Sequence, residues 1–361
     1  MSSAKTSLAN GLASSFRHTC STSLSFVLLI LAASVLYGCA SDDTPAAARQ
    51  CPITVEAQLP IREVGRRFVT TVSINGHPMS MLIDTGTSMS TLTPHAAEML
   101  RLPYDQKRIG IVNGIGGRLE PQHLMIASLI QLGTQNWADV HLVTANVFGP
   151  DDLDPDAPSG SIGADLLSRY NVMLDFPNQT MTLYSLCDGP FAPATGVVQT
   201  LELEQPSTNS LRALLMIPVR LNGHPVHALI DTGSSRTSAT RDAAISSGVD
   251  GATLEQERAA TIGGAKGVRV NGHVHVFETI QIGSATYPRG PVLVQDASTP
   301  GVDMLLGMDF LKSRKVWISY ATRTVSLEGR TAPRISVSRD GLPTRKLFTL
   351  PAAPSPSATS R

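Results

Sequence analysis

Residues 79–86 read Met79-Ser-Met-Leu-Ile-Asp-Thr-Gly86, and residues 226–233 read Val226-His-Ala-Leu-Ile-Asp-Thr-Gly233. The pentapeptide Leu-Ile-Asp-Thr-Gly therefore occurs twice, with Asp84 in the first copy and Asp231 in the second. A single Asp-Thr-Gly would mean little, because a given tripeptide arises by chance about once in 8,000 positions. Two copies with matching neighbours indicate that a longer stretch of the chain is repeated.

Further landmarks recur in the same order around the two pentapeptides. They are Asn-Gly-His-Pro at 75–78 and 222–225, a glycine pair at 116–117 and 263–264, and a hydrophobic-Gly pair at 162–163 and 306–307. Landmarks that keep their register indicate duplication of a unit of about 145 residues, which is the size of a domain rather than of a solenoid repeat.

Within each unit the sequence pattern is that of short strands. Phe68–Ile74 and Leu214–Leu221 are aliphatic or β-branched runs, and each leads into Asn-Gly. Asn-Gly between such runs is a strong hairpin signal, because both central residues of a type I′ turn need a positive φ. The following strand, Met79–Ile83 or Val226–Ile230, delivers the Asp at its end. The pattern predicts an all-β protein with two lobes.

The boundaries follow from the repeat and from composition. We predict a signal peptide at 1–38, a tether at 39–54, a first lobe at 55–187, a linker at 188–209, a second lobe at 210–330 and a tail without its own fold at 331–361. The tail is rich in Pro, Ser and Arg, a composition that disfavours a packed core.

Two lobes related by a pseudo-twofold axis would bring Asp84 and Asp231 together at their interface. Two carboxylates about 3 Å apart share one proton, because two negative charges at that distance repel each other. One carboxylate can then act as general base toward a water molecule, while the other acts as general acid toward a substrate carbonyl oxygen. This chemistry needs no cofactor and no metal ion.

The chain resembles the retropepsin-like (retroviral-protease-like) aspartic proteases, in the bacterial form that fuses two such domains. The resemblance covers about residues 55–186 and 210–328 and implies two acid-protease β-barrel lobes with the active site between them. It identifies Asp84 and Asp231 as the catalytic pair. It also implies flaps over the substrate, formed by Gly114, Ile115, Gly116 and Gly117 in the first lobe and by Ile262, Gly263 and Gly264 in the second. The hydrophobic-Gly pairs match the family's element beneath each catalytic loop.

The residues that follow each Asp are expected to support the site. Gly86 and Gly233 allow a tight turn and the close approach of a second backbone. The hydroxyls of Thr85 and Thr232 can lock the turn, and we expect those of Thr87 and Ser234 to donate to the carboxylates. Such donation favours the charged form and lowers the pKa of the pair, which predicts an acidic activity optimum.

Other functions fit parts of the pattern. The main alternative is a catalytically inactive, peptide-binding lipoprotein with the same fold, and a purely structural envelope lipoprotein is a weaker one. The chain has 361 residues, with Lys+Arg 29 balanced by Asp+Glu 29, and zero net charge disfavours nucleic-acid binding. His273-Val-His275 lacks nearby Cys or acidic partners, so no metal site is predicted. We expect a polypeptide substrate and a monomer, since the duplication supplies an internal dimer.

The amino terminus has the layout of an exported protein. Leu24–Gly38 is an apolar run preceded by basic residues, and it is shorter than the roughly 20 residues that span a membrane. It ends in Leu36-Tyr37-Gly38-Cys39, which resembles the bacterial lipobox and implies lipidation of Cys39. The alternative is an uncleaved signal anchor. Either route predicts a membrane-anchored protein facing the periplasm, and Ala40 after the cysteine favours the outer membrane.

The cysteine count agrees with export. Beyond Cys20 in the signal and Cys39, the chain has Cys51 and Cys187, an even pair in an oxidising compartment. A disulfide between them would enclose the first lobe, and two unpaired thiols are the alternative.

Overall fold

The computed structural model describes residues 54–111, 113–114, 117–118, 120–145, 157–186, 189, 191, 198–204, 213–263, 269–287, 289–297 and 300–329. The predicted signal, Cys39, Cys51, Cys187 and the tail lie outside these residues. The chain divides into the units Met1–Ala47 and Ala48–Arg361, and the fold below is that of the second unit. Among the described residues, no helix combines the length and apolar character needed to cross a membrane.

The first lobe is a sheet that closes on itself. Its strands pair in the order β2 (Arg62–Val64), β3 (Arg67–Ile74), β4 (His77–Ile83), β11 (Gly160–Ile162), β5 (Thr91–Leu92), β10 (Gln135–Thr144), β9 (Gln122–Leu132) and β6 (Tyr104–Gly110). An additional pairing of β3 with β9 closes part of this order into a ring. The helices of this lobe are the short α1 (Pro94–Leu100) and α2 (Ala164–Leu167).

The second lobe repeats this arrangement. Its strands pair in the order β18 (Ala259–Gly263), β19 (Arg269–Phe277), β22 (Gly290–Gln295), β17 (Ser238–Thr240), β23 (Met304–Leu306), β16 (His224–Ile230), β15 (Met216–Leu221), β20 (Ile280–Ile282) and β21 (Ala285–Tyr287). Its helices are α3 (Arg241–Ser246), α4 (Gly251–Gln256) and α5 (Met308–Leu311). The alternation of short strands and tight turns agrees with the sequence pattern.

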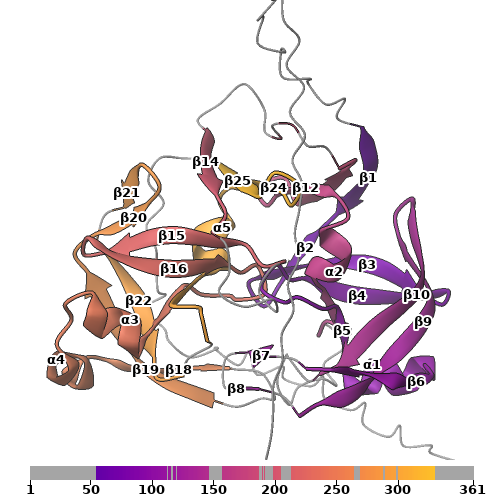
Figure 1. Ribbon diagram of the computed structural model, residues 1–361, viewed down its shortest axis with the longest axis horizontal. Coiled ribbons are helices and arrows are strands. Elements are labelled where there is room, and N and C mark those ends of the chain that lie inside the picture. The colour runs from indigo at the N-terminus through magenta and orange to yellow at the C-terminus, as the bar shows by residue number, and fades with distance from the viewer. Residues whose placement is uncertain are drawn as a thin grey trace, which may run out of the picture. The chain divides into compact units, whose positions relative to one another are not determined.

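A third sheet joins the two lobes. Its strands run in the order β1 (Val55–Pro60), β13 (Thr180–Tyr184), β12 (Asn171–Asp175), β24 (Lys315–Ser319), β25 (Thr324–Glu328) and β14 (Val198–Glu202), and β14, β25, β24 and β12 can be followed in Figure 1. At its centre β12 of the first lobe pairs antiparallel with β24 of the second, with Met173 opposite Trp317. β14 falls within the predicted linker 188–209, so part of that segment is a strand of the sheet rather than a linker.

The two hairpins that lead to the Asp residues form as the sequence predicts. Asn75 and Gly76 have φ of 50° and 85°, and Asn222 and Gly223 have φ of 50° and 83°. These are the positive values that a type I′ turn requires. β3 pairs antiparallel with β4, and β15 pairs with β16 in the same register. Each turn thereby sets the register of the strand that ends at an Asp.

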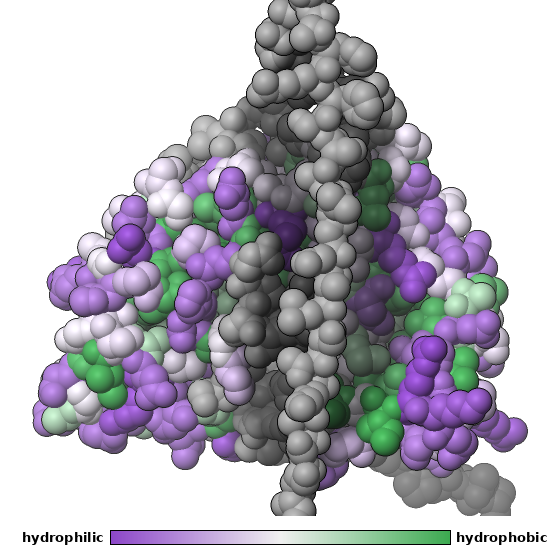
Figure 2. All heavy atoms as spheres, in the orientation of Figure 1, coloured by the Kyte–Doolittle hydropathy of each residue, from purple (hydrophilic) through white to green (hydrophobic). Residues whose placement is uncertain are grey.

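A continuous apolar core extends through both lobes and the joining sheet. One cluster of buried side chains includes Val72 and Ile83 of the first lobe, Val219 and Ile230 of the second, and Ile318 of the joining sheet. Hydrophilic residues cover much of the described surface in the view of Figure 2, with smaller apolar patches between them. The predicted all-β fold with two lobes is confirmed, and the shared core couples the lobes to each other.

Candidate active site

Parallel strand pairing places both Asp residues. β4 runs parallel to β11 and β16 runs parallel to β23, so each Asp emerges beside the hydrophobic-Gly pair of its own lobe. The backbone N–H of Asp84 donates to the carbonyl of Ile162 at 3.0 Å, and that of Asp231 donates to the carbonyl of Leu306 at 3.0 Å. Each Asp therefore starts its loop from a buried, hydrogen-bonded strand end.

Thr85 and Thr232 join the two Asp loops through reciprocal hydrogen bonds. The hydroxyl of Thr85 donates to the carbonyl of Ile230 at 2.7 Å, and the hydroxyl of Thr232 donates to that of Ile83 at 2.7 Å. Each hydroxyl oxygen also accepts the backbone N–H of the other threonine, at 3.0 and 3.1 Å. Thr85 is 0% exposed and Thr232 1% exposed, so these bonds are shielded from water. The threonines lock the two lobes to each other.

The glycines after the threonines make room for the opposite carboxylate. A Cβ atom added to Gly86 would lie 2.4 Å from Cγ of Asp231, and one added to Gly233 would lie 2.5 Å from Cγ of Asp84. Each carboxyl group thus sits against the backbone of the other lobe's loop. The expected close approach is there, although it is made by the opposite carboxyl group rather than by a second backbone.

The carboxylates accept backbone donors, and their donor sets differ. Asp84 Oδ1 accepts the N–H of Gly86 at 2.9 Å, whereas Asp231 Oδ1 accepts those of Gly233 and Ser234 at 2.8 and 3.0 Å. The expected hydroxyl donors at 87 and 234 bind elsewhere. Thr87 Oγ1 donates to the carbonyl of Met89 at 3.1 Å, and Ser234 Oγ donates to that of Arg236 at 2.8 Å.

This geometry overturns the reasoning behind the predicted acidic optimum. Burial raises the pKa of Asp84 to about 7, and the nearby charge of Asp231 adds to the rise. Burial also raises the pKa of Asp231, to about 6, against the lowering effect of its two backbone donors. Desolvation of the carboxylates therefore outweighs hydrogen bonding, and the pair holds a proton to higher pH than ordinary aspartates do. Asp231 is the better-stabilised anion of the two, because it accepts two backbone N–H groups and Asp84 accepts one.

Arg67 is a third charged group of the site, and the sequence analysis did not identify it. Its positive charge opposes the rise in pKa of both Asp84 and Asp231. Arg67 begins β3, and the register of the repeat puts the buried Leu214 at the corresponding place in the second lobe. A residue present in only one copy carries no repeat signal, which is why the sequence did not point to it.

A second pair of aspartates supports the two loops, and these also went unpredicted. Oδ1 of Asp165 accepts the backbone N–H and the hydroxyl of Ser90 at 2.9 and 2.7 Å. Oδ1 of Asp309 accepts the same two groups of Thr237 at 2.8 and 2.7 Å. The signal was available, because an Asp stands two residues after each hydrophobic-Gly glycine. Burial raises the pKa of both of these carboxyl groups.

The predicted flap segments are described in part. β7 (Asn113–Gly114) pairs with β8 (Gly117–Arg118), with Gly114 opposite Gly117. In the second lobe, Ile262 and Gly263 lie in β18 and pair with β19. Ile115, Gly116 and Gly264 lie outside the described residues. The strands that flank both predicted flap segments are therefore paired, and the role of these segments in covering a substrate stays a prediction.

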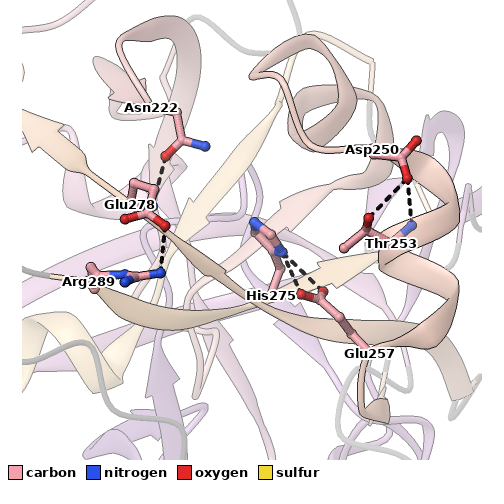
Figure 3. A network of polar contacts seen from close by, with 7 residues as sticks. All are labelled: Asn222, Asp250, Thr253, Glu257, His275, Glu278 and Arg289. Atoms are coloured by element: carbon pink, nitrogen blue, oxygen red, sulfur yellow. Dashed lines mark hydrogen bonds and ion pairs between the residues drawn. The ribbon is translucent and has the colours of Figure 1, made fainter.

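His273 and His275, the residues weighed as metal ligands, lie on β19. Figure 3 shows the ring of His275 facing Glu257, and its Nδ1 lies 2.8 Å from Oε1 of that carboxylate. His275 also packs edge-on against Phe277. This histidine is thus held by an acidic side chain of its own lobe.

The comparison with protein families identifies the class. A family model described as "Aspartyl protease" matches residues 70–166 and 217–310, which together make up more than half of the chain. The chain therefore belongs to this family of retropepsin-like aspartic proteases, and each matched segment contains one Asp-Thr-Gly motif.

Curated relatives match over a shorter stretch. DNA damage-inducible protein 1 of Cryptococcus neoformans var. neoformans serotype D is 30% identical over 123 residues, which is 34% of this chain and 27% of that protein. The protein of the same name from Neurospora crassa is 31% identical over 139 residues, or 38% and 30%. The chain spans less than a third of the length of these relatives. A crystal structure of aspartic proteinase from Irpex lacteus matches with a TM-score of 0.46 and 13% identity, covering 76% of this chain and 97% of that one.

The threonine interlock makes a prediction about stability. Replacing Thr85 with Val keeps the shape of the side chain but leaves the Ile230 carbonyl and the Thr232 N–H without their partner. We expect a loss of about 3 kcal/mol in the free energy of unfolding, because each buried unsatisfied group costs about 1–3 kcal/mol. Urea unfolding measures the loss. Thr85→Ser keeps the hydroxyl and is the matched control, and equal stability of the two variants would contradict the assigned role.

The raised pKa values predict how stability depends on pH. A carboxyl group whose pKa is higher in the folded state binds its proton more tightly there, so stability is greatest at low pH and falls as pH rises toward about 7. Asp84→Asn removes this titration. Between about pH 4 and pH 8 the free energy of unfolding of the parent chain should fall by at least about 1 kcal/mol more than that of the variant. Asp242→Asn, at an exposed position, is the control. If the free energy of unfolding depends on pH in the same way in the parent and in Asp84→Asn, Asp84 does not have a raised pKa.

Proposed function

We propose that the protein is an aspartic endopeptidase that hydrolyses peptide bonds with a water molecule activated between Asp84 and Asp231. The observation that carries the proposal is the paired loop geometry, in which each carboxyl group lies against the other lobe's glycine. Family membership supports peptide-bond hydrolysis in general.

The unequal hydrogen bonding of Asp84 and Asp231 gives the two carboxyl groups different catalytic roles. Asp231 accepts two backbone donors and Asp84 accepts one, so a single negative charge is better stabilised on Asp231. In the singly protonated pair, Asp231 is the general base that takes a proton from water. Asp84 is the general acid that protonates the carbonyl oxygen of the substrate. The hydroxide attacks the carbonyl carbon as this proton moves, giving a tetrahedral gem-diol. Asp231 then passes its proton to the leaving nitrogen while Asp84 takes one back from a gem-diol hydroxyl, so the C–N bond breaks and the amine and the carboxylic acid are released.

The pH range of activity follows from the same pair. Turnover needs one proton on the two carboxyl groups, and both pKa values are raised above that of an ordinary aspartate. We infer that the activity maximum lies at weakly acidic to neutral pH, because burial makes the pair keep its shared proton to higher pH than ordinary aspartates do. This replaces the acidic optimum expected from the sequence.

The decisive experiment is a proteolysis assay with a matched variant. The full chain is incubated with a reduced and alkylated protein from about pH 3 to about pH 8, with and without a statine-type transition-state mimic. Asp231→Asn keeps the side-chain shape and should lower kcat by at least about a hundredfold. Asp242→Asn is the control for charge removal and should leave kcat unchanged.

Two outcomes would contradict the proposed activity of the Asp84–Asp231 pair. A folded parent chain that binds peptide but cuts nothing at any pH would favour the inactive, peptide-binding alternative. Cleavage that survives in Asp231→Asn would place the chemistry elsewhere.

We also propose that the protein acts on envelope or other extracytoplasmic polypeptides from a membrane-bound position. The support is the amino-terminal sequence alone, in which an apolar run ends at Cys39. Labelling Gram-negative cells that express the chain with a radioactive or clickable fatty acid tests the anchor. The label should enter the parent chain and be lost in Cys39→Ser, with Cys20→Ser as control. An unlabelled parent that still sediments with membranes would favour the signal anchor.

A further inference from the structure

Met89 and Arg236 occupy the same place in the two halves of the site. Each follows its Asp by five residues, and its carbonyl accepts the hydroxyl of Thr87 or Ser234. The backbone of each also packs on a hydrophobic-Gly glycine: a Cβ atom added to Gly163 would lie 2.8 Å from the carbonyl carbon of Met89, and one added to Gly307 would lie 2.4 Å from that of Arg236. The two side chains are therefore symmetry counterparts, and one is apolar whereas the other is positively charged.

The surroundings of Met89 are apolar. Its partly buried side chain packs against the cluster of Leu124, Val143 and Ala145 in the first lobe. Asp105, which lies opposite Leu124 on the neighbouring strand β6, is ion-paired with His141. This half of the site therefore suits an aliphatic or aromatic side chain of a bound peptide.

The surroundings of Arg236 are cationic. The turn between β2 and β3 carries Arg66, and this hairpin reaches the second lobe, where Glu63 lies 3.9 Å from Lys312 at the end of α5. Burial lowers the pKa of Arg236, and the positive charges of Arg66 and Arg258 lower it further. The positive charges of Arg66, from the first lobe, and of Arg258, just before β18, therefore act on Arg236 beside the second Asp loop.

Of the carboxylates that bear on this cluster, Glu257 is paired, whereas Asp309 is only partly hydrogen-bonded. Glu257, the neighbour of Arg258, pairs with His275, as Figure 3 shows. Asp309 attracts Arg236; its Oδ1 accepts both donors of Thr237, whereas its buried Oδ2 has no hydrogen-bond partner among the described residues. Within the described part of the chain, none of Arg66, Arg236 and Arg258 forms an ion pair with a carboxylate. Like charges held together in this way repel each other and attract an anion.

We propose that the site selects polypeptides that place a carboxylate beside Arg236 and an apolar side chain beside Met89. A substrate extended across the two Asp residues meets symmetry-related surfaces on either side of the scissile bond. The surface around Met89 therefore contacts substrate residues on one side of that bond, and the surface around Arg236 contacts residues on the other side. The carboxylate can be an Asp or Glu side chain or the carboxyl terminus of the peptide. The inference rests on the proposed endopeptidase function and adds its substrate class.

A cleavage-site survey followed by matched peptides tests the proposal. The full chain is incubated with a tryptic digest of a bacterial proteome, and the new termini are identified by mass spectrometry. We expect enrichment of Asp and Glu on one side of the cleaved bond only. Two synthetic peptides that differ as Glu or Gln at the enriched position should differ about tenfold in kcat/KM, with the Glu peptide preferred. Salt should reduce this ratio.

Swapping the symmetry counterparts gives the sharpest variants. Arg236→Met installs the residue of the first lobe and should abolish the preference for Glu over Gln. Met89→Arg installs the residue of the second lobe and should create a new preference for Glu on the opposite side of the bond. Arg289→Met removes an exposed arginine that pairs with Glu278 in Figure 3 and should leave the ratio unchanged.

Separate outcomes bear on the selectivity and on the enzyme activity. Retention of the Glu preference in Arg236→Met, or cleavage without any acidic enrichment, would overturn the selectivity while leaving proteolysis intact. If nothing is cut, calorimetry with the Asp231→Asn variant and two otherwise apolar peptides that differ as one Glu or Gln measures the selectivity through binding alone. A peptide with an amidated carboxyl terminus then distinguishes a side-chain carboxylate from a terminal one, since only the latter loses affinity on amidation.

Discussion

The site depends on the reciprocal hydrogen bonding of Thr85 and Thr232. Each threonine binds a carbonyl and an N–H of the other lobe, and both side chains are almost completely buried. A buried polar group that loses its partner is costly, so the two loops have one low-energy arrangement relative to each other. The opposed carboxyl groups, the close-packed glycines and the raised pKa values all follow from this arrangement. The joining sheet supplies the apolar burial that holds the lobes at the distance these bonds require.

Duplication supplies the symmetric frame, and single substitutions within it differentiate the two halves. The hairpins, the parallel strand pairs and the supporting aspartates recur in both lobes. The donors to the carboxylates, Arg67, and the Met89 and Arg236 counterparts do not. The Met89 and Arg236 difference lies in the Asp loops, where side chains are freer to diverge than at packed core positions, whereas Arg67 stands on β3, where the repeat has a buried leucine. A symmetric pair of acids can thereby acquire unequal roles, and a symmetric binding surface can acquire a charged half.

Sequence reasoning was accurate where one local interaction dominates. The Asn-Gly turns formed with positive φ at both residues, because few other conformations suit that dipeptide between strands. It was wrong where several acceptors competed. The hydroxyls at 87 and 234 had two kinds of acceptor within reach, and they bind backbone carbonyls rather than the carboxylates. It also read Val198–Glu202 as part of a linker, although this short segment gains its strand partner only from β25, more than a hundred residues away.

By itself the sequence determined the duplication, the two strand-borne Asp-Thr-Gly loops and the family, since these rest on residue identity and on spacing along one chain. Only the tertiary structure decided the ionisation of the acids, the destination of each hydroxyl and the gathering of Arg66, Arg236 and Arg258. The reason is that burial and electrostatic energy depend on distances between segments remote in sequence, and a linear pattern does not contain those distances. The motif by itself predicts the proposed chemistry, whereas the proposed pH range and substrate class rest on the three-dimensional surroundings.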